Sequence, residues 1–116
     1  MKILIVDDEA SNLSALMSIL KAKGHEPIDA YNGEQAVNYL QETSDVDVVI
    51  TDLQMTGIDG IEVIRKAKQL YPKIRAFLIS GRLSEYSKKA AMESGAEKTF
   101  HKPFGIRGLQ EAGLIT

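Results

Sequence analysis

The chain has 116 residues, of which 44% are hydrophobic and 26% are charged. Both fractions are near the globular average and the length fits one domain. We therefore expect a single domain over residues 1–116 and exclude a disordered chain or a two-domain enzyme. Fourteen Lys and Arg against sixteen Asp and Glu give a net charge of −2, so the chain lacks the basic surface that direct nucleic-acid binding requires.

The chain contains no cysteine, which excludes disulfides and thiolate zinc sites and suits a reducing compartment. Its apolar runs are too short to cross a membrane. The first run, at 2–6, ends at Asp7 and is too short for a signal peptide. These features predict a cytoplasmic protein without a membrane partner.

Short apolar segments alternate with longer amphipathic segments, an order typical of a parallel sheet with helical crossovers. The segments at 2–6 and 46–51 are almost wholly apolar, as expected for central strands covered on both faces. We predict strands at 2–6, 26–30, 46–51, 75–79 and 98–101.

Five helices are predicted between and after these strands, at 11–23, 33–43, 60–70, 83–94 and 104–112. The helix at 83–94 has only one apolar cluster, Ala90 to Met92, so we expect it to be buried shallowly. The last helix contains Gly105 and Gly108. Because each internal glycine costs about 0.5–1 kcal/mol relative to alanine, this helix should be short or frayed.

Polar residues follow four of the predicted strands: Asp7 and Asp8, then Asp52, Ser80 and Lys102. The carboxyl ends of parallel strands meet at one edge of the sheet, where ligands bind. Three carboxylates that lie close together repel one another, so one of them should have a raised pKa in the absence of a cation. All-oxygen ligation favours Mg²⁺ or Mn²⁺.

Each of these residues also has a simpler interpretation when it is taken alone. Asp7 and Asp8 could cap the following helix, and Asp52 and Ser80 could be turn residues. Lys102 could be a solvated lysine. Their occurrence together at one sheet edge instead favours a metal-assisted site for phosphoryl chemistry.

In these features the chain resembles the receiver domain of two-component response regulators, also called the CheY-like family, over essentially its whole length. The residues that carry the resemblance are VDDE at 6–9, DLQMTGIDG at 52–60, LISG at 78–81, GA at 95–96 and KPF at 102–104. The resemblance implies a flavodoxin-like α/β fold: a five-stranded parallel sheet of order 2-1-3-4-5 with helices on both faces.

The resemblance also implies a phosphorelay function, in which Asp52 accepts a phosphoryl group from a phosphohistidine on a sensor histidine kinase or a phosphotransfer protein. Such a domain is a switch that catalyses only its own phosphorylation and dephosphorylation. The resemblance implies Mg²⁺ as cofactor, held by Asp7, Asp8, Asp52 and the backbone carbonyl of Gln54.

Ser80 and Lys102 match the residues that bind phosphoryl oxygens and so share the catalytic role of the acceptor. Pro103 matches a proline preceded by a cis bond that directs the lysine into the site. Gln54 and Arg82 match two positions that tune hydrolysis of the phosphoryl group. Phosphorylation is expected to switch the surface formed by the elements at 83–94, 98–101 and 104–112.

The sequence departs from the family pattern at two positions. Thr56 follows Met55 where a proline is common, which removes a constraint on that loop. Thr99 stands where relatives commonly have an aromatic residue that rotates inward on activation. Phe100 points to the opposite face of its strand and cannot substitute for that residue, so we expect it to pack in the core.

Two alternatives belong to other functional classes. A pseudo-receiver would dock a partner without being phosphorylated. A phosphohydrolase of the haloacid-dehalogenase type would need a second aspartate where Gln54 stands. The output could be an unknown partner, an effector domain of a longer protein, or a phosphorylation-dependent homodimer. Nucleotide-binding glycine motifs are absent from the sequence.

Overall fold

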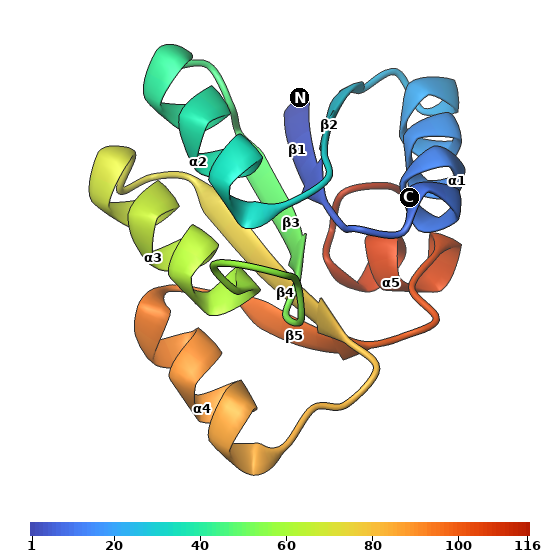
Figure 1. Cartoon of the computed structure of the whole chain (residues 1–116). Coiled ribbons are helices and arrows are strands. Elements are labelled where there is room, and N and C mark those ends of the chain that lie inside the picture. Colours follow the sequence, from blue (N-terminus) through green and yellow to red (C-terminus); the bar gives the residue numbers. More distant parts are fainter.

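The structure, a computed structural model, describes residues 1–116 and contains one five-stranded parallel sheet (Figure 1). The strand order is β2-β1-β3-β4-β5, as the family resemblance implies. The strands are β1 (Lys2–Val6), β2 (Glu26–Ala30), β3 (Val48–Asp52), β4 (Arg75–Ser80) and β5 (Lys98–His101).

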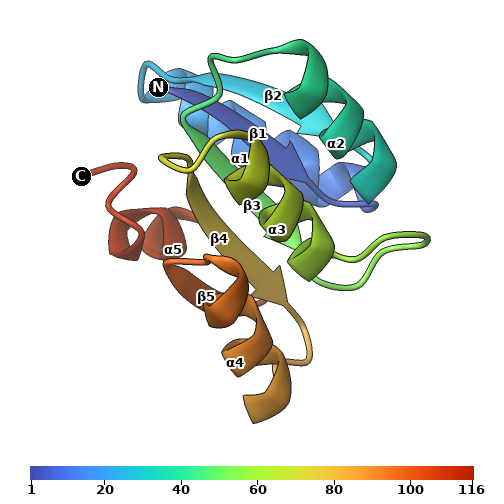
Figure 2. The same cartoon turned by 90° about the vertical axis from the view of Figure 1, so that its left-hand side faces the viewer.

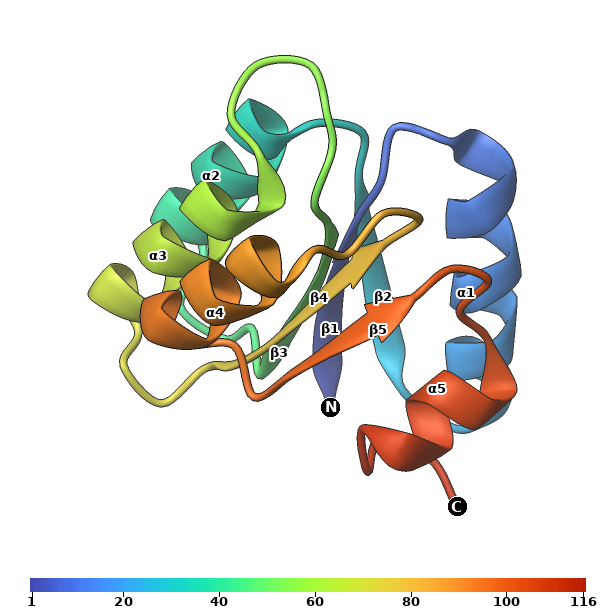
Figure 3. The same cartoon turned by 90° about the horizontal axis from the view of Figure 1, so that it is seen from below.

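Five helices connect or follow the strands and form the outer layers. They are α1 (Ala10–Ala22), α2 (Gly33–Glu42), α3 (Gly60–Leu70), α4 (Glu85–Ser94) and α5 (Ile106–Glu111). Seen from below, α2, α3 and α4 cover one face of the sheet, and α1 and α5 cover the other (Figure 3). The predicted three-layer α/β architecture is therefore confirmed.

The alternation of side chains along the strands divides the core into two clusters, one on each face of the sheet. Leu4 and Val49 belong to the cluster beneath α2, α3 and α4, whereas Ile5 and Ile50 belong to the cluster beneath α1 and α5. Because β1 and β3 are buried on both faces, their apolar runs show no polar alternation.

Polar side chains fix the starts of three helices. Asn32, Asp59 and Ser84 each accept a hydrogen bond from a backbone N–H in the first turn, at Gln35, Glu62 and Ser87 respectively. Such N-caps satisfy donors that the helix itself leaves free. The cap at Ser84 explains why α4 begins at Glu85 and not at residue 83, where the sequence pattern placed it.

The third strand begins at Val48 and ends at Asp52, one residue later than predicted, so Asp52 belongs to the strand. Its predicted start at residue 46 is wrong because the Asp47 carboxylate accepts the N–H of Lys2 at 2.8 Å. The Lys2 N–H would pair with a backbone carbonyl if β3 began earlier, but here it donates to a side chain instead. The fourth strand similarly extends one residue further, to Ser80. Helix α1 spans residues 10–22 instead of the predicted 11–23, and α2 ends at residue 42 instead of 43.

Helix α4 is the most weakly buried of the longer helices, as predicted. Only Ala91 is buried in it, and Tyr86 is 82% exposed. Figure 2 shows α4 projecting beside β5 at the periphery of the fold. No helix in the chain combines the length and the apolar character needed to cross a membrane.

The last helix is short, as predicted, and spans six residues instead of the nine at 104–112. Gly105 occupies its N-cap position with φ −153° and ψ −137°, and Gly113 follows it with φ +76°. Leu109 and Leu114 are buried against α1 and the sheet. The segment is thus anchored by packing on both sides of its helical turn.

Candidate functional site

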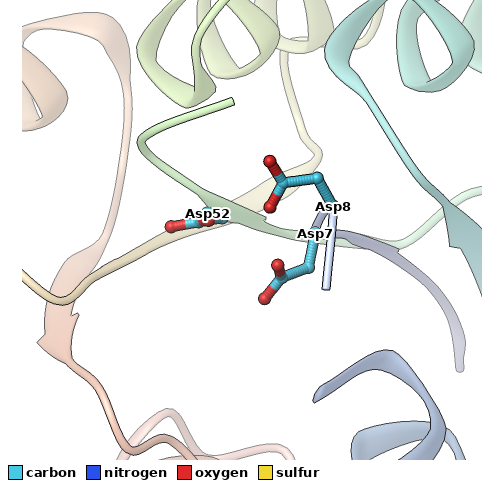
Figure 4. A group of neighbouring side chains, drawn as sticks. All are labelled: Asp7, Asp8 and Asp52. Carbon is cyan, nitrogen blue, oxygen red and sulfur yellow. The ribbon is translucent and has the colours of Figure 1, made fainter. Parts of the chain in front are cut away.

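Three aspartates meet at the carboxyl edge of the sheet. Asp7 and Asp8 follow β1 directly, and Asp52 is the last residue of the neighbouring strand β3 (Figure 4). One carboxylate oxygen from each residue lies within 4.8 Å of those of the other two. Asp7 and Asp52 are buried, with 5% and 6% of their surface exposed, whereas Asp8 faces solvent. The cluster is therefore enclosed on the protein side and open through Asp8.

Two donors from the start of α1 hold the Asp7 carboxylate. The backbone N–H of Glu9 donates to Oδ1 at 2.9 Å, and the Asn12 side-chain amide donates to Oδ2 at 3.4 Å. The N-cap of α1 is Glu9, without a side-chain cap. The interpretation of Asp7 and Asp8 as helix caps is therefore wrong.

Lys102, which follows β5, reaches across the sheet edge to this cluster. Its Nζ donates to Asp52 Oδ2 at 3.2 Å and lies 3.4 Å from Asp7 Oδ2. A third carboxylate, that of Glu9, lies 3.4 Å from the same ammonium. The bond between Lys102 and Pro103 is cis, as the resemblance implied. Lys102 is thus an ion-paired residue at the site and not a solvated surface lysine.

The electrostatics of the site follow from burial and from this crowding of carboxylates. Burial raises the pKa of Asp52, the charges of Asp7 and Asp8 raise it further, and Lys102 opposes the shift. A raised pKa in one carboxylate was predicted, but burial contributes more to it than repulsion does. Burial alone would lower the pKa of Lys102, yet Asp52, Asp7 and Glu9 outweigh it and raise the pKa above its ordinary value.

Three other predicted residues flank the cluster without touching its carboxylates. Ser80 ends β4 and is fully buried, and its Oγ accepts a hydrogen bond from the backbone N–H of Arg82 at 3.0 Å. The side chains of Arg82 and Gln54 are exposed in the loops that follow β4 and β3. The carbonyl of Gln54 accepts no backbone hydrogen bond, so it is available to a ligand.

Two glycines shape the loop between β3 and α3. Gly57 has φ +86°, a conformation that side-chain-bearing residues rarely adopt. A Cβ atom at Gly60 would collide with the backbone carbonyl of Asp52, so α3 can start against the end of β3 only because this residue is glycine. These two glycines allow the tight loop beside Asp52.

A hollow of about 400 Å³ adjoins the cluster on the α1 side of the sheet. Asp7, Glu9 and Lys102 line its polar end, and Leu16 and Phe104 line its apolar end. Phe100 packs nearby against the rings of Phe77 and Phe104, at centroid distances of 6.2 and 5.0 Å. The predicted core role of Phe100 is confirmed.

Glu9 and Asn12 contact the site although sequence reasoning assigned no role to either. Glu9 was visible only as the residue after two aspartates, and Asn12 as a polar residue in the first turn of a helix. Asn12 donates to Asp7 through its side chain. Both contacts depend on how the loop before α1 folds back, which no local pattern specifies.

The donor set of the cluster fits a hard divalent cation. All three groups that converge are carboxylates, and oxygen ligands suit Mg²⁺, Mn²⁺ or Ca²⁺ better than zinc or copper. A cation there would also relieve the repulsion among the carboxylates. Lys102 lies on one flank of the cluster, where it can meet an anionic group held by such a cation.

Comparison with known proteins agrees with this arrangement. Residues 3–113 match the family model for the response regulator receiver domain. A receiver domain protein from Clostridium thermocellum is 28% identical, with a TM-score of 0.88 over 96% of this chain and 89% of that one. A CheY-like receiver domain protein from Methanospirillum hungatei is 26% identical, with a TM-score of 0.89 over 95% of this chain and 87% of that one.

The beryllofluoride-activated NtrC4 receiver domain, which was solved as a dimer, is 30% identical, with a TM-score of 0.88 over 97% of this chain and 93% of that one. The family model covers nearly the whole chain. The chain belongs to the response regulator receiver domains, which are switches of two-component signal transduction.

Proposed function

We propose that Asp52 accepts a phosphoryl group from a phosphohistidine on a sensor histidine kinase or a phosphotransfer protein. The surroundings of Asp52 carry this proposal. Its carboxylate is almost fully buried, lies 3.2 Å from the Lys102 ammonium, and has two further carboxylates beside it. An aspartate so placed can act as a nucleophile toward phosphorus.

In the transfer, a carboxylate oxygen of Asp52 forms a bond to phosphorus while the bond from phosphorus to the histidine nitrogen breaks. The electron pair of that bond stays on the imidazole nitrogen. Negative charge on the equatorial oxygens needs positive charge and hydrogen-bond donors around it. Lys102 supplies an ammonium at this position, and the Ser80 hydroxyl, whose oxygen accepts from the Arg82 N–H, can donate its own proton.

Mg²⁺ is the proposed cofactor, and Mn²⁺ can take its place. Asp7, Asp8, Asp52 and the backbone carbonyl of Gln54 would hold the ion, which would neutralise charge on the transferring group. The convergent carboxylate oxygens and the unused carbonyl of Gln54 support this assignment. The exposed side chains of Gln54 and Arg82 stand where they would govern the approach of water to the phosphoryl group.

The signal would leave the domain through the surface formed by α4, β5 and α5. The shallow burial of α4 supports this, because an element with few buried side chains can shift at low cost. With Thr99 in place of an aromatic residue, the movement would depend on the β4–α4 loop, where Ser80 holds Arg82. A second copy of this chain is one candidate partner, since the related NtrC4 receiver domain was solved as a dimer in its beryllofluoride-activated form.

A non-phosphorylated pseudo-receiver remains the alternative hypothesis. Its weakness is that three aspartates converge at one edge and Lys102 pairs with two of them, Asp7 and Asp52, an arrangement that a docking module does not need. A phosphohydrolase of outside esters is disfavoured by Gln54, which cannot act as an acid or a base.

Intact-mass measurement after incubation with acetyl phosphate and Mg²⁺ tests the proposal. We expect a mass increase of one phosphoryl group, lost in Asp52→Asn and lost when the metal is chelated. Asp59→Asn is the matched control, because asparagine also caps a helix and the mass increase should persist. Beryllofluoride binding, followed by NMR, covers the case of a short-lived phosphoryl group. If neither the added mass nor beryllofluoride binding is observed, the pseudo-receiver is correct.

A further inference from the structure

Glu9 is the N-cap residue of α1, yet its side chain does not cap the helix. An N-cap side chain usually accepts a hydrogen bond from the first turn, and glutamate is a poor choice for this role. The Asn12 N–H donates to the backbone carbonyl of Glu9, and no N–H of the first turn donates to the Glu9 side chain. The Glu9 carboxylate is therefore free, and it lies 3.4 Å from Lys102 Nζ.

The Lys102 ammonium lies close to three carboxylates, of which two belong to the acidic cluster and one does not. Asp52 and Asp7, at 3.2 and 3.4 Å, belong to the acidic cluster. Glu9, at 3.4 Å, lies outside that cluster and is 60% exposed. It is the one partner of Lys102 that a metal bound by the three aspartates would leave unoccupied.

A divalent cation in the cluster would compete with Lys102 for the same oxygens. The cation would repel the ammonium and weaken its attachment to Asp7 and Asp52. Lys102 then has two destinations, solvent or Glu9. A lysine lost to solvent could no longer oppose the charge of a phosphoryl group on Asp52.

We propose that Glu9 is a positioning residue for Lys102, holding the ammonium at the rim of the acidic cluster while a divalent cation occupies the three aspartates. This inference rests on the proposed function. The contact joins two segments from distant parts of the chain, the β1–α1 loop and the segment after β5, and both residues line the hollow of about 400 Å³. Glu9 thereby lowers the cost of moving Lys102 off the metal ligands, and it favours metal binding through Lys102.

A simpler explanation is that Glu9 attracts the metal by its own negative charge. The two explanations differ in their dependence on Lys102. If Glu9 acts through Lys102, replacing the lysine removes the effect of Glu9. If it acts by direct attraction, its effect persists without the lysine.

The test is a double-mutant cycle on Mg²⁺ affinity, measured by NMR titration of the unphosphorylated domain. We expect Glu9→Gln to weaken Mg²⁺ binding about 2- to 5-fold, the range of a partly exposed ion pair. In the Lys102→Met background the same substitution should change the affinity by less than about 1.5-fold. Glu85→Gln removes an equal charge from a residue that pairs with Lys88 and not with Lys102, and should leave the affinity unchanged.

The Glu9→Asp variant tests whether the length of the side chain matters in addition to its charge. Aspartate keeps the charge and is a better N-cap, but it is one methylene shorter. We expect it to weaken Mg²⁺ binding as Glu9→Gln does, without loss of thermal stability. Equal weakening by Glu9→Gln in both backgrounds, full affinity in Glu9→Asp, or no effect of Glu9→Gln would each overturn the inference. Failure of the wild-type domain to bind Mg²⁺ or accept a phosphoryl group would instead overturn the proposed function.

Discussion

The free-energy cost of burying the Asp52 carboxylate is offset by interactions with its neighbours. An unpaired charge in this position would be strongly unfavourable, but Lys102 lies 3.2 Å away and supplies the compensating charge. Gly60 lets α3 approach the carbonyl of the same residue. Asp52 is thus fixed through both its side chain and its backbone, as the proposed phosphoryl transfer would require.

The ion pair between Arg75 and Glu97, unlike the contact of Lys102 with Asp52, lies at the surface, because both of its side chains are more than one-third exposed. Arg75 Nε donates to Glu97 Oε1 at 2.7 Å, and this contact lowers the pKa of Glu97 from 4.5. The folded state therefore binds fewer protons at this site than the unfolded state. Its stabilising effect is present above pH 4.5 and is lost as the pH falls through the folded pKa.

Glu97→Gln should therefore lower the free energy of unfolding at neutral pH, by no more than about 1 kcal/mol because of solvent screening. The difference between the variant and wild type should shrink as the pH falls below 4.5. Urea denaturation across this pH range measures it. Glu93→Gln, an exposed position on α4 without an ion pair, is the control. A loss that is independent of pH would contradict the assignment.

Helices α3 and α4 differ in how firmly they are held. In α3, the side chains of Val63, Ile64 and Ala67 are buried, whereas α4 buries only Ala91. The ends of α4 are nevertheless well defined, by the Ser84 cap and by Gly95 with φ +113°. Helix α4 therefore has regular boundaries but little packing to keep it in one place.

This difference predicts faster amide hydrogen exchange in α4 than in α3. Opening free energy follows the apolar surface that opening exposes, so we expect central α4 amides to exchange at least about tenfold faster. Hydrogen exchange followed by NMR, without metal or phosphodonor, measures both helices in one sample. Equal protection of the two helices would contradict the view that α4 is the movable element.

The short helix α5 depends on the tail that follows it. Arg75 donates to the carbonyl of Ala112 at 3.0 Å, and Lys98 donates to that of Glu111 at 3.2 Å. The His25 ring contacts the carbonyl of Leu114 at 2.8 Å. Arg75 and Lys98 bind carbonyls that the end of a short helix leaves unpaired, and His25, which precedes β2, binds the tail beyond the helix. Side chains of β4, β5 and the segment before β2 therefore keep the last element in place.

At the scale of the whole molecule, the site at the carboxyl edge is linked to global stability. The acidic cluster exists only when β1 and β3 are paired, because Asp7 and Asp8 come from one and Asp52 from the other. A ligand that binds the folded state alone stabilises it by mass action. Metal binding should therefore be visible in the thermal unfolding of the entire domain.

Magnesium at about ten times its dissociation constant should stabilise the domain by about 1.4 kcal/mol, which raises the Tm by roughly 5 °C for a chain of this size. Calorimetry with and without a chelator measures this shift, with NaCl of equal ionic strength as the control. Asp8→Asn should reduce the shift strongly. A rise in Tm that NaCl reproduces, or that survives in Asp8→Asn, would show that the cluster does not hold the ion.

The sequence by itself determined the elements and the edge at which the polar residues meet. Branched residues at 3–6 and 48–50 specify buried strands, and the right-handed crossover rule brings Asp7, Asp52 and Lys102 to one edge. Local periodicity is a property of neighbours along the chain, which is why the predicted elements agree with the structure. The observed bounds of a strand differ from the predicted ones where a side chain, such as that of Asp47, accepts a hydrogen bond from a backbone N–H.

Only the tertiary structure decided which groups at that edge touch. The contact of Lys102 with Glu9 joins residues far apart in the sequence, and burial, more than repulsion, raises the pKa of Asp52. Such contacts depend on loop paths and side-chain rotamers, which packing across the whole sheet selects. Sequence patterns specify which residues lie at the same edge of the sheet. The distances between their side chains, which determine their chemistry, are set only when the helices pack on both faces of the sheet.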